Sequence, residues 1–384
     1  MRIDAHTHVQ PPLTQSQLAA LSEREPYWGF LLDPQPLGRS AQGWADELRM
    51  IADMDAAGVD AAVIQGAYYR SHRRCVAATL RHQRMARRSP GRLLVFGAVQ
   101  PLAGDAAVAE VERLAASGAA GVGELNPYGQ GFGLEDAAFL RIAEACIRHD
   151  LPLNLHISED VGRDYAGRST VPPSAYYALA LRYPELRLIL AHWGGGLALH
   201  EIVPEVRRAL ANTWYDTAAS PLLYPTAAIF PAAIAAAGAH KILFGSDYPL
   251  RLYPRTQPQA DMRPFLSEIG ALGLDSQTEA ALLGGNMARL LARRESRAAP
   301  PPPPTSLTTP LAGPQPTIEL ITPVRQIAER QPQTKAVLEA YGIPWRAGEI
   351  PPWERLGQAA AAHGHGPAAR ARLLAELRAA CGSS

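Results

Sequence analysis

Residues 1–9 read MRIDAHTHV, and this stretch decides how the rest of the chain is interpreted. A short strand-like run, Arg2–Asp4, leads directly into the histidine–X–histidine pair of His6 and His8. Side chains two positions apart in an extended chain point to the same side, so both imidazoles can reach one metal ion. A single pair of this kind also arises by chance. The pattern farther along the chain has to decide between a metal site and coincidence.

Short apolar runs alternate with helix-like stretches over about 290 residues, and two of these stretches end in Gly58 and Gly118, the usual cap residue. Strands this short and apolar are typical of parallel sheets covered on both faces, and eight of them predict a (β/α)8 TIM barrel. An open doubly wound sheet is the alternative, although no G-x-G-x-x-G motif follows the first strand. The predicted strands are Arg2–Asp4, Ala61–Gln65, Leu93–Val99, Gly121–Leu125, Pro152–His156, Leu186–Ala191, Thr213–Thr217 and Lys241–Gly245.

Side chains that can bind metal recur where the predicted strands end. Glu124, His156, His192 and Asp247 take this place in strands 4, 5, 6 and 8. Barrel enzymes build their active sites at this end of the strands. Each residue alone has an ordinary structural interpretation, such as a hydrogen-bonded core histidine or an aspartate in a turn. Together with the pair in the first strand, they predict one metal site.

The first 295 residues contain the motifs DAHTHV, LNLHIS, LILAHWGG, KILFGSDYP and GGNMARLL in this order. With these motifs the chain resembles the amidohydrolase superfamily, specifically its amidohydrolase-2 group of TIM-barrel metal-dependent hydrolases. The resemblance implies that His6, His8 and His156 are metal ligands and that Asp247 is a ligand that also moves protons. For His192 it implies either metal binding or polarisation of the substrate oxygen. The expected cofactor is a divalent metal, with Zn²⁺ as our prediction.

Glu124 has three interpretations, because many members of the superfamily place a carboxylated lysine on the fourth strand, where this chain reads GVGELNPYG. The carboxylate could bridge a second ion, as a glutamate does in related nucleases. It could instead accept a hydrogen bond from a ligand imidazole, or be purely structural. One ion and two ions therefore both stay open.

The chemistry expected of such a site is hydrolysis. A metal-bound water has its pKa lowered toward about 7, and Asp247 would carry its proton to the leaving group. We therefore predict a metal-dependent hydrolase of an amide, a lactone or a related C–N or C–O bond. The closest alternative is a metal-dependent decarboxylase, a lyase that uses the same residues. A second alternative is a non-catalytic metal-binding or interaction protein.

Arginines near the strand ends favour a small acidic substrate, because guanidinium groups bind carboxylates in a forked geometry. Arg70, Arg163 and Arg251 are the candidates, although each alone is also compatible with a solvated surface charge. Asn126 could hydrogen-bond the substrate. An apolar wall could come from the aromatic residues Tyr68, Tyr69, Trp193 and Tyr248.

The C-terminal part of the chain differs in composition. Residues 297–318 are rich in Pro, Thr and Ser and predict a semi-rigid linker between a barrel at 1–296 and a small helical domain at 319–384. The stretch VRQIAERQPQTKAVLEAYGI resembles the N-terminal domain of iron–sulfur-cluster repair proteins, but residues 344–348 read PWRAG where those relatives carry cysteines. We predict that this domain docks a protein partner. A second histidine–X–histidine pair, His363 and His365, is interpreted as a chance feature of a loop.

Composition limits the remaining functions. A formal charge of +1 argues against a nucleic-acid or membrane-surface partner, and no apolar run approaches the roughly 20 residues of a membrane span. The three cysteines are far apart in sequence, which argues against a disulfide framework and favours the cytoplasm. A small-molecule substrate is expected, and the family resemblance is consistent with a homodimer.

Overall fold

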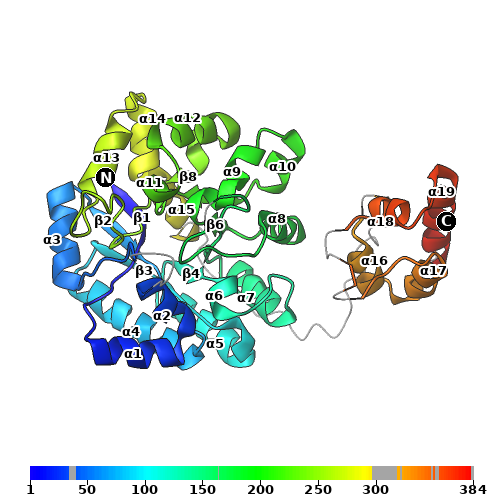
Figure 1. The fold of residues 1–384 in the computed structure, drawn as a ribbon, viewed down its shortest axis with the longest axis horizontal. Helices are drawn as coiled ribbons and strands as arrows, with labels where there is room; N and C mark the ends of the chain where they lie inside the picture. Colours follow the sequence, from blue (N-terminus) through cyan, green and yellow to red (C-terminus); the bar gives the residue numbers. More distant parts are fainter. Residues whose placement is uncertain are drawn as a thin grey trace. The chain divides into compact units, whose positions relative to one another are not determined.

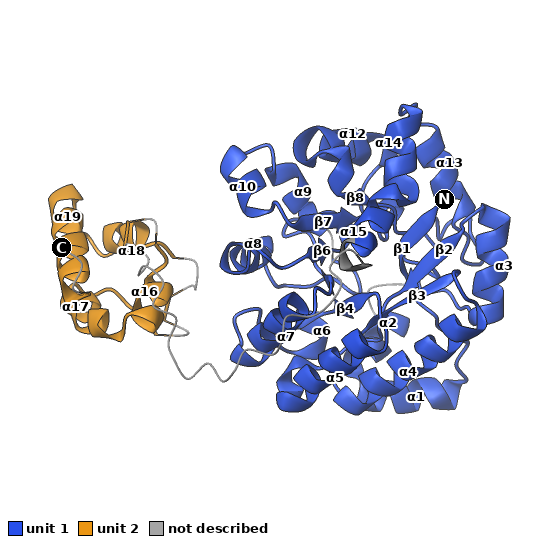
Figure 2. Ribbon diagram, turned by 180° about the vertical axis from the view of Figure 1, so that it is seen from behind, with its two compact units in different colours: residues 1–300 blue, residues 301–384 orange. Residues whose placement is uncertain are grey.

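The computed structural model describes residues 1–33, 40–162, 164–295, 318–320, 322–346, 349–350 and 354–381. The chain divides into two compact units, Met1–Pro300 and Pro301–Ser384 (Figure 2). All but the last residue of the predicted Pro-rich linker falls outside the described residues. The domain limits at 296 and 319 therefore stay a prediction.

The first unit is a nearly closed barrel of eight parallel strands in chain order, with helices around it (Figure 1). The first and last strands meet where the Ala5 N–H donates to the Phe244 carbonyl at 2.7 Å and Thr7 bridges to Tyr248. The predicted TIM barrel is confirmed, and this strand order excludes the doubly wound sheet. The strands are β1 Ile3–Thr7, β2 Ala61–Ile64, β3 Leu93–Gly97, β4 Gly121–Leu125, β5 Leu153–Leu155, β6 Leu188–Leu190, β7 Thr213–Asp216 and β8 Ile242–Leu243.

All eight strands occur where the sequence predicts them; β4 has the predicted ends, and the ends of the other seven are shifted. Every strand residue is buried except Leu94, which is partly buried, as expected for a sheet covered on both faces. The first strand extends to Thr7 because this residue pairs with Ile64 on one side and Tyr248 on the other. His6 therefore lies inside β1 rather than after it.

An apolar cluster supports the site from inside the barrel. Ile3, Ile189 and Leu243 precede the predicted ligands in their strands, and they belong to one buried cluster with Met287 and Leu290 of the last barrel helix. The polar side chains at the strand ends therefore rest on an apolar core.

One of the helix ends predicted from the sequence is confirmed: Gly58 is the C-cap of α3 and has a left-handed conformation with φ of 65°. In the parts of the chain that the structure describes, no helix has the length and apolar character needed to cross a membrane. The α-helices are α1 Gln15–Arg24, α2 Pro26–Leu32, α3 Glu47–Ala57, α4 His72–Arg88, α5 Asp105–Ala116, α6 Pro127–Gln130, α7 Ala137–Arg148, α8 Pro173–Arg182, α9 Leu197–His200, α10 Pro204–Ala209, α11 Ser220–Leu223, α12 Thr226–Ala237, α13 Arg263–Gly270, α14 Ser276–Ala280 and α15 Asn286–Glu295. Shorter turns are η1 Pro101–Ala103, η2 His192–Gly196, η3 Ala239–Lys241 and the π-turn η4 Ala281–Gly285.

The named elements of the second unit are all helices in its described residues, and the unit has its own buried core, which includes Val324, Ile327, Leu338, Leu356 and Leu373. Its short amphipathic helices confirm the prediction of a small helical C-terminal region. They are α16 Val324–Arg330, the turn η5 Pro332–Thr334, α17 Lys335–Ala340, α18 Leu356–Ala362 and α19 Pro367–Ala380.

Candidate metal centre

The carboxyl ends of five strands bring the predicted ligands together. All of them are buried except His8, which is partly buried, and all except His6 line one cavity of about 320 Å³. The six residues are His6, His8, Glu124, His156, His192 and Asp247.

One group of possible ligand atoms surrounds His8. Its Nε2 lies 3.3 Å from His6 Nε2, 3.8 Å from Glu124 Oε2 and 3.2 Å from Asp247 Oδ1. His6 Nε2 lies 3.6 Å from Glu124 Oε2 and 3.8 Å from Asp247 Oδ1. Tetrahedral ligands at ordinary zinc distances are about 3.3 Å apart, so these separations fit a cation between the side chains.

A second group faces the other oxygen of Glu124. Oε1 lies 2.8 Å from His156 Nδ1 and 3.7 Å from His192 Nε2, and these two nitrogens are 3.1 Å apart. Glu124 therefore stands between two groups of imidazoles, one for each carboxylate oxygen. This is the position that both a bridging role and an orienting role require.

Hydrogen bonds fix which ring nitrogen each imidazole turns toward the centre. His6 Nδ1 contacts Asp216 Oδ2 at 2.8 Å, His156 Nε2 contacts the Gly167 carbonyl at 2.9 Å, and His192 Nδ1 contacts the Ala218 carbonyl at 3.0 Å. These partners only accept, so each contacted nitrogen carries the proton. In His6 and His192 the opposite nitrogen is left to bind a cation, as in many metal sites. Both nitrogens of His156 face oxygen acceptors, because its Nδ1 also lies 2.8 Å from Glu124 Oε1.

Asp216, at the end of β7, is a residue of the candidate site that the sequence analysis missed. It accepts from His6 Nδ1, from Asn154 Nδ2 at 3.2 Å, and from the backbone N–H groups of His192 at 3.0 Å and Ala218 at 3.1 Å. One carboxylate thus positions two of the predicted ligands. The available signal was a carboxylate at the end of an apolar strand.

Asp4 holds the two ends of the site together in a similar way. It accepts from the Ser246 N–H at 3.0 Å and the Ser246 hydroxyl at 2.5 Å, and from the His6 N–H at 3.2 Å. Burial raises the pKa of Asp4 to about 7, although the bonds from Ser246 oppose this. The loop that carries Asp247 is thereby fixed to β1.

The backbone is strained at two of the predicted ligands. His192 and Asp247 have φ angles of 55° and 63°, a region that costs a non-glycine residue about 1–3 kcal/mol. His192 begins a left-handed turn through Gly195, where a Cβ would lie 2.4 Å from the Ser158 carbonyl oxygen. Such strain persists where the surrounding structure enforces it, and it is common at functional sites.

The electrostatics of the cluster favour positive charge. Burial alone would lower the pKa of His6, but Asp216 and Glu124 raise it well above the ordinary value. Burial also opposes protonation of His192, yet Glu124 and Asp247 raise its pKa to about 9. The pKa of Glu124 is held well below its usual range, because His156 and His6 outweigh its burial. In the absence of protons, a divalent cation supplies the charge that these carboxylates require.

The rest of the cavity wall is largely apolar. Tyr27 and Trp28 come from α2, and Tyr68 follows β2; Trp28 and Tyr68 have ring centroids 4.9 Å apart. Leu222 and Leu223 of α11 form another part of the wall. Tyr68, which the sequence analysis names as a possible wall residue, lines this cavity.

The family model for Amidohydrolase matches residues 3–293 of the chain. The chain belongs to the amidohydrolase family. The predicted family is thereby confirmed, and the family and the His–Glu groups together support a divalent-metal site in an enzyme. A comparison with curated proteins gives no significant match.

Solved structures of similar fold cover the amidohydrolase unit. The 5-carboxyvanillate decarboxylase of Sphingomonas paucimobilis is 19% identical, with a TM-score of 0.59 over 76% of this chain and 98% of that chain. The manganese-bound enzyme of the same name from Novosphingobium aromaticivorans is 18% identical, with a TM-score of 0.61 over 76% and 97%. The 2,6-dihydroxybenzoate decarboxylase of Rhizobium is 18% identical, with a TM-score of 0.55 over 76% and 98%. At these identities the likeness establishes the fold.

Two predicted substrate-binding residues of this amidohydrolase lie in its core. Trp193 is fully buried, and its Nε1 donates to the Ser220 hydroxyl at 2.9 Å. Asn126 is also fully buried; it accepts from the Gly129 N–H at 2.8 Å and donates to the Tyr27 hydroxyl at 3.0 Å. Neither lines the cavity, but Asn126 holds Tyr27, which does.

The predicted arginines are dispersed. Arg70 is exposed and lines a separate depression with His72 and Gln100. Arg251 donates to the carbonyl of Ser40 at 2.5 Å, and Ser40 is part of the cavity wall. Arg163 lies outside the described residues.

Proposed function

We propose that this protein is a metal-dependent decarboxylase of a small aromatic or unsaturated carboxylic acid. The observation that carries the proposal is the combination, in one cavity, of the histidine–carboxylate cluster with the aromatic side chains of Tyr27, Trp28 and Tyr68. A planar acid can place its carboxylate at the cluster and its flat face against these rings. The decarboxylase names of the similar structures support the same activity.

The residues present fit a divalent ion, since three imidazoles are anchored at one ring nitrogen each and two carboxylates lie beside the others. His6, His8, His156 and Asp247 would hold it, and His192 would either bind it or polarise the substrate oxygen. Glu124 would bridge a second ion or orient His156, whose Nδ1 is 2.8 Å away. Mixed nitrogen and carboxylate ligands suit both Zn²⁺ and Mn²⁺.

When bound, the ion would supply a Lewis acid for the substrate carboxylate and a neighbouring oxygen. The protein would supply the proton. The bond between the substrate carbon and its carboxyl carbon breaks, the electron pair stays on the substrate carbon, carbon dioxide leaves, and Asp247 protonates that carbon. Burial opposes ionisation of Asp247, but His8 and His6 lower its pKa, so the carboxylate is ionised between turnovers and has to take up one proton from solvent in each cycle. The aromatic walls would keep other water away from the reacting carbon.

Hydrolysis, the reaction that the sequence analysis placed first, uses the same ligands and the same aspartate. It differs in requiring a nucleophilic water, whose atoms are added across the cleaved bond, and in releasing no carbon dioxide. Product analysis therefore separates the two functions.

The test uses purified protein loaded with Zn²⁺ or Mn²⁺ and a panel of hydroxybenzoates, unsaturated diacids, lactones and amides. We expect release of carbon dioxide from an acid, with the decarboxylated product identified by mass spectrometry. Asp247→Asn should lower this rate by about 10²–10⁴-fold. Asp261→Asn is the matched control, since Asp261 pairs with Arg263 and does not line the cavity. Hydrolysed lactone or amide without carbon dioxide release would overturn the proposal.

A further inference from the structure

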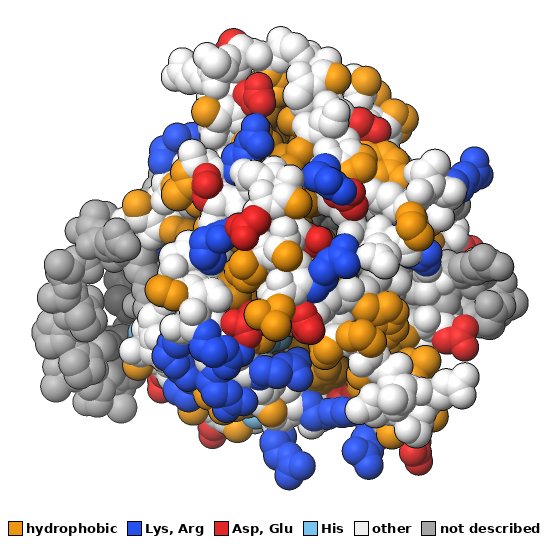
Figure 3. All heavy atoms as spheres, turned by 90° about the vertical axis from the view of Figure 1, so that its left-hand side faces the viewer, with side chains coloured by type: hydrophobic (Ala, Val, Ile, Leu, Met, Phe, Trp, Pro, Cys, Tyr) orange, Lys and Arg blue, Asp and Glu red, His pale blue; other side chains and the backbone are white. Residues whose placement is uncertain are grey.

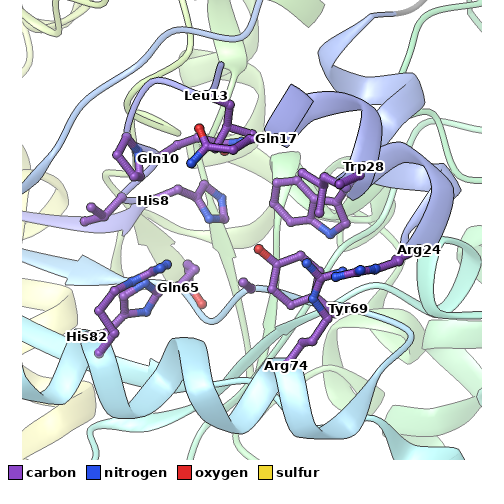
Figure 4. A pocket seen from close by; sticks show the side chains of 16 residues that line it. His8, Gln10, Leu13, Gln17, Arg24, Trp28, Gln65, Tyr69, Arg74 and His82 are labelled. Atoms are coloured by element: carbon purple, nitrogen blue, oxygen red, sulfur yellow. The ribbon is translucent and has the colours of Figure 1, made fainter. Parts of the chain in front are cut away.

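A second cavity of about 330 Å³ lies beside the metal centre, between α1, α2, the end of β2 and α4 (Figure 4). It shares His8, Gln10 and Trp28 with the cavity described above, so the two spaces are neighbours. Its volume lies at the lower end of the range for small-molecule sites, about 300–1,000 Å³. The proposed decarboxylation assigns no role to it.

Two buried polar side chains in its wall lack partners. His82 is 2% exposed, and neither of its ring nitrogens has a hydrogen-bond partner among the described residues. Gln65 is 1% exposed; its Nε2 donates to the Ala5 carbonyl at 3.0 Å, but its Oε1 is unpaired within the same described set. Figure 4 shows both on the same side of the view. Buried polar groups are rarely left unpaired, so these atoms indicate something that binds there.

The chemistry of these two groups defines what they can hold. Burial, with Arg81 and His8 nearby, lowers the pKa of His82 to about 3, so the ring is neutral near pH 7. A neutral imidazole offers one donor and one acceptor, and Gln65 Oε1 offers an acceptor. A hydroxyl group, which both donates and accepts, complements this pair.

Cations line the same space. Arg74 and Arg81 are seven residues apart on α4, so they share one helix face, and Arg24 of α1 adds a third guanidinium. No Asp or Glu is among the described wall residues. Glu25 offsets part of this charge from outside the wall, because its Oε1 lies 3.8 Å from Arg74 Nη1. In the view of Figure 4, Arg24 and Arg74 lie opposite His82, with Tyr69 between them.

The surface around this region is also basic. Figure 3 shows Lys and Arg side chains gathered in the lower part of the face that it views, the level of α1 and α4 in Figure 1. Arg73 and Arg87 of α4 are exposed in addition to Arg81. A basic surface raises the local concentration of anions.

We propose that this second cavity is a binding site for a small carboxylate anion that also carries a hydroxyl group. The carboxylate pairs with Arg74 and the exposed Arg24 and Arg81, the hydroxyl lies between His82 and Gln65, and the apolar body packs against Trp28 and Tyr69. An anion confined to this cavity requires neither a metal ion nor decarboxylation. The anion is either a separate molecule or the far end of one that reaches the metal centre past His8.

The probe is 4-hydroxy-3-iodobenzoate, soaked into crystals of the full chain and located by the anomalous signal of iodine. We expect iodine in the second cavity. Calorimetry in solution should show that Arg74→Gln weakens binding by about 5- to 10-fold, as for loss of a charge-assisted hydrogen bond. Arg84→Gln, an exposed position on the same helix that does not line the cavity, should change it by less than about twofold.

His82→Leu gives an independent readout. It removes a buried group that has no partner, so the melting temperature should hold or rise while affinity for the probe falls about 5-fold. 2-Iodophenol, which lacks the carboxylate, should bind equally to the wild type and Arg74→Gln. Iodine only at the metal centre or nowhere, or equal affinities for Arg74→Gln and Arg84→Gln, would overturn the site.

Chelation separates the two sources of the anion. If it is a separate molecule, affinity for the probe stays within about twofold when the metal is removed. If one molecule spans both cavities, affinity falls on chelation, while the dependence on Arg74 persists.

Discussion

The chain contains two histidine–X–histidine pairs that behave differently. His6 and His8 lie on and just after β1, where the imidazole nitrogens are 3.3 Å apart and face two carboxylates. His363 and His365 follow α18; His363 is exposed, and His365 contacts the Tyr341 carbonyl at 2.7 Å. No group of possible metal ligands in the described residues includes the second pair. The histidine–X–histidine motif thus forms a candidate metal site only where a barrel strand carries it and other strands place carboxylates beside it.

The largest effect should come from breaking the first pair. The double variant His6→Ala/His8→Ala removes two nitrogen ligands, so bound metal should fall below roughly a tenth of the wild-type amount and activity should be lost. Elemental analysis and the decarboxylation assay measure this. The matched control is His363→Ala/His365→Ala, for which both values should be unchanged. Equal metal content in the two double variants would refute the distinction.

Glu124→Gln distinguishes the possible roles of the carboxylate that lies between the two groups of imidazoles. If Glu124 bridges two ions, the metal content should fall from about two to one per chain, because the amide no longer neutralises a second cation. If it orients His156, the content stays at one and the affinity falls. Titration with Zn²⁺ and Mn²⁺ followed by elemental analysis distinguishes these results. Unchanged content and affinity would leave Glu124 a structural residue.

Asp216→Asn should have a smaller but clear effect. It removes the charge that anchors His6 Nδ1 and two backbone N–H groups, and loss of such an anchor costs about 10- to 100-fold in metal affinity. Competition with a chelator gives the affinity, and circular dichroism checks the fold. An affinity within a factor of two of the wild type would show that Asp216 has no part in positioning the ligands.

The pH dependence of stability should differ with and without metal. In the metal-free protein the pKa of His192 is raised to about 9, so its protonation stabilises the fold fully below about pH 6.5 and this is lost as the pH rises through 9. The loss should be on the order of 1–3 kcal/mol. In the loaded protein the imidazoles are already deprotonated, so stability should not fall in this window. Chemical denaturation at pH 6, 8 and 9.5 measures both forms.

The smallest effect concerns the second pair itself. His365→Ala removes one hydrogen bond to the Tyr341 carbonyl and a ring contact at 5.4 Å between centroids. We expect about 0.5–1.5 kcal/mol less stability in the C-terminal unit, with metal content unchanged. Thermal unfolding of the full chain with metal analysis tests this; a loss of metal would assign the second pair a role in binding.

The sequence predicted the eight strands and the convergence of the ligands because both depend on local pattern. Apolar runs mark buried parallel strands, and the residue after each run lies at the active end of a barrel. The positioning roles of Asp216 and Asp4 could not be predicted from the sequence, because they depend on hydrogen bonds to His192 and Ser246, which lie in other parts of the chain. Trp193 was wrongly predicted to line the cavity. The backbone turns left-handed at this residue and its ring lies in the core, and the strand pattern of the sequence does not predict such a turn. Tyr27 and Trp28 reach the cavity from α2, outside the family motifs.

The bond between Asp4 and Ser246 joins residues that are 242 positions apart. Because β1 carries His6 and the loop after β8 carries Asp247, the ligand set is incomplete until the first and last strands have met. Contacts between such distant parts of a chain are slow to form during folding. Metal uptake should therefore be among the last events in refolding, later than the recovery of helix content. A chain still emerging from the ribosome would have the complete ligand set only after its eighth strand was released, so a partly assembled barrel offers only part of that set, such as the group of Glu124, His156 and His192.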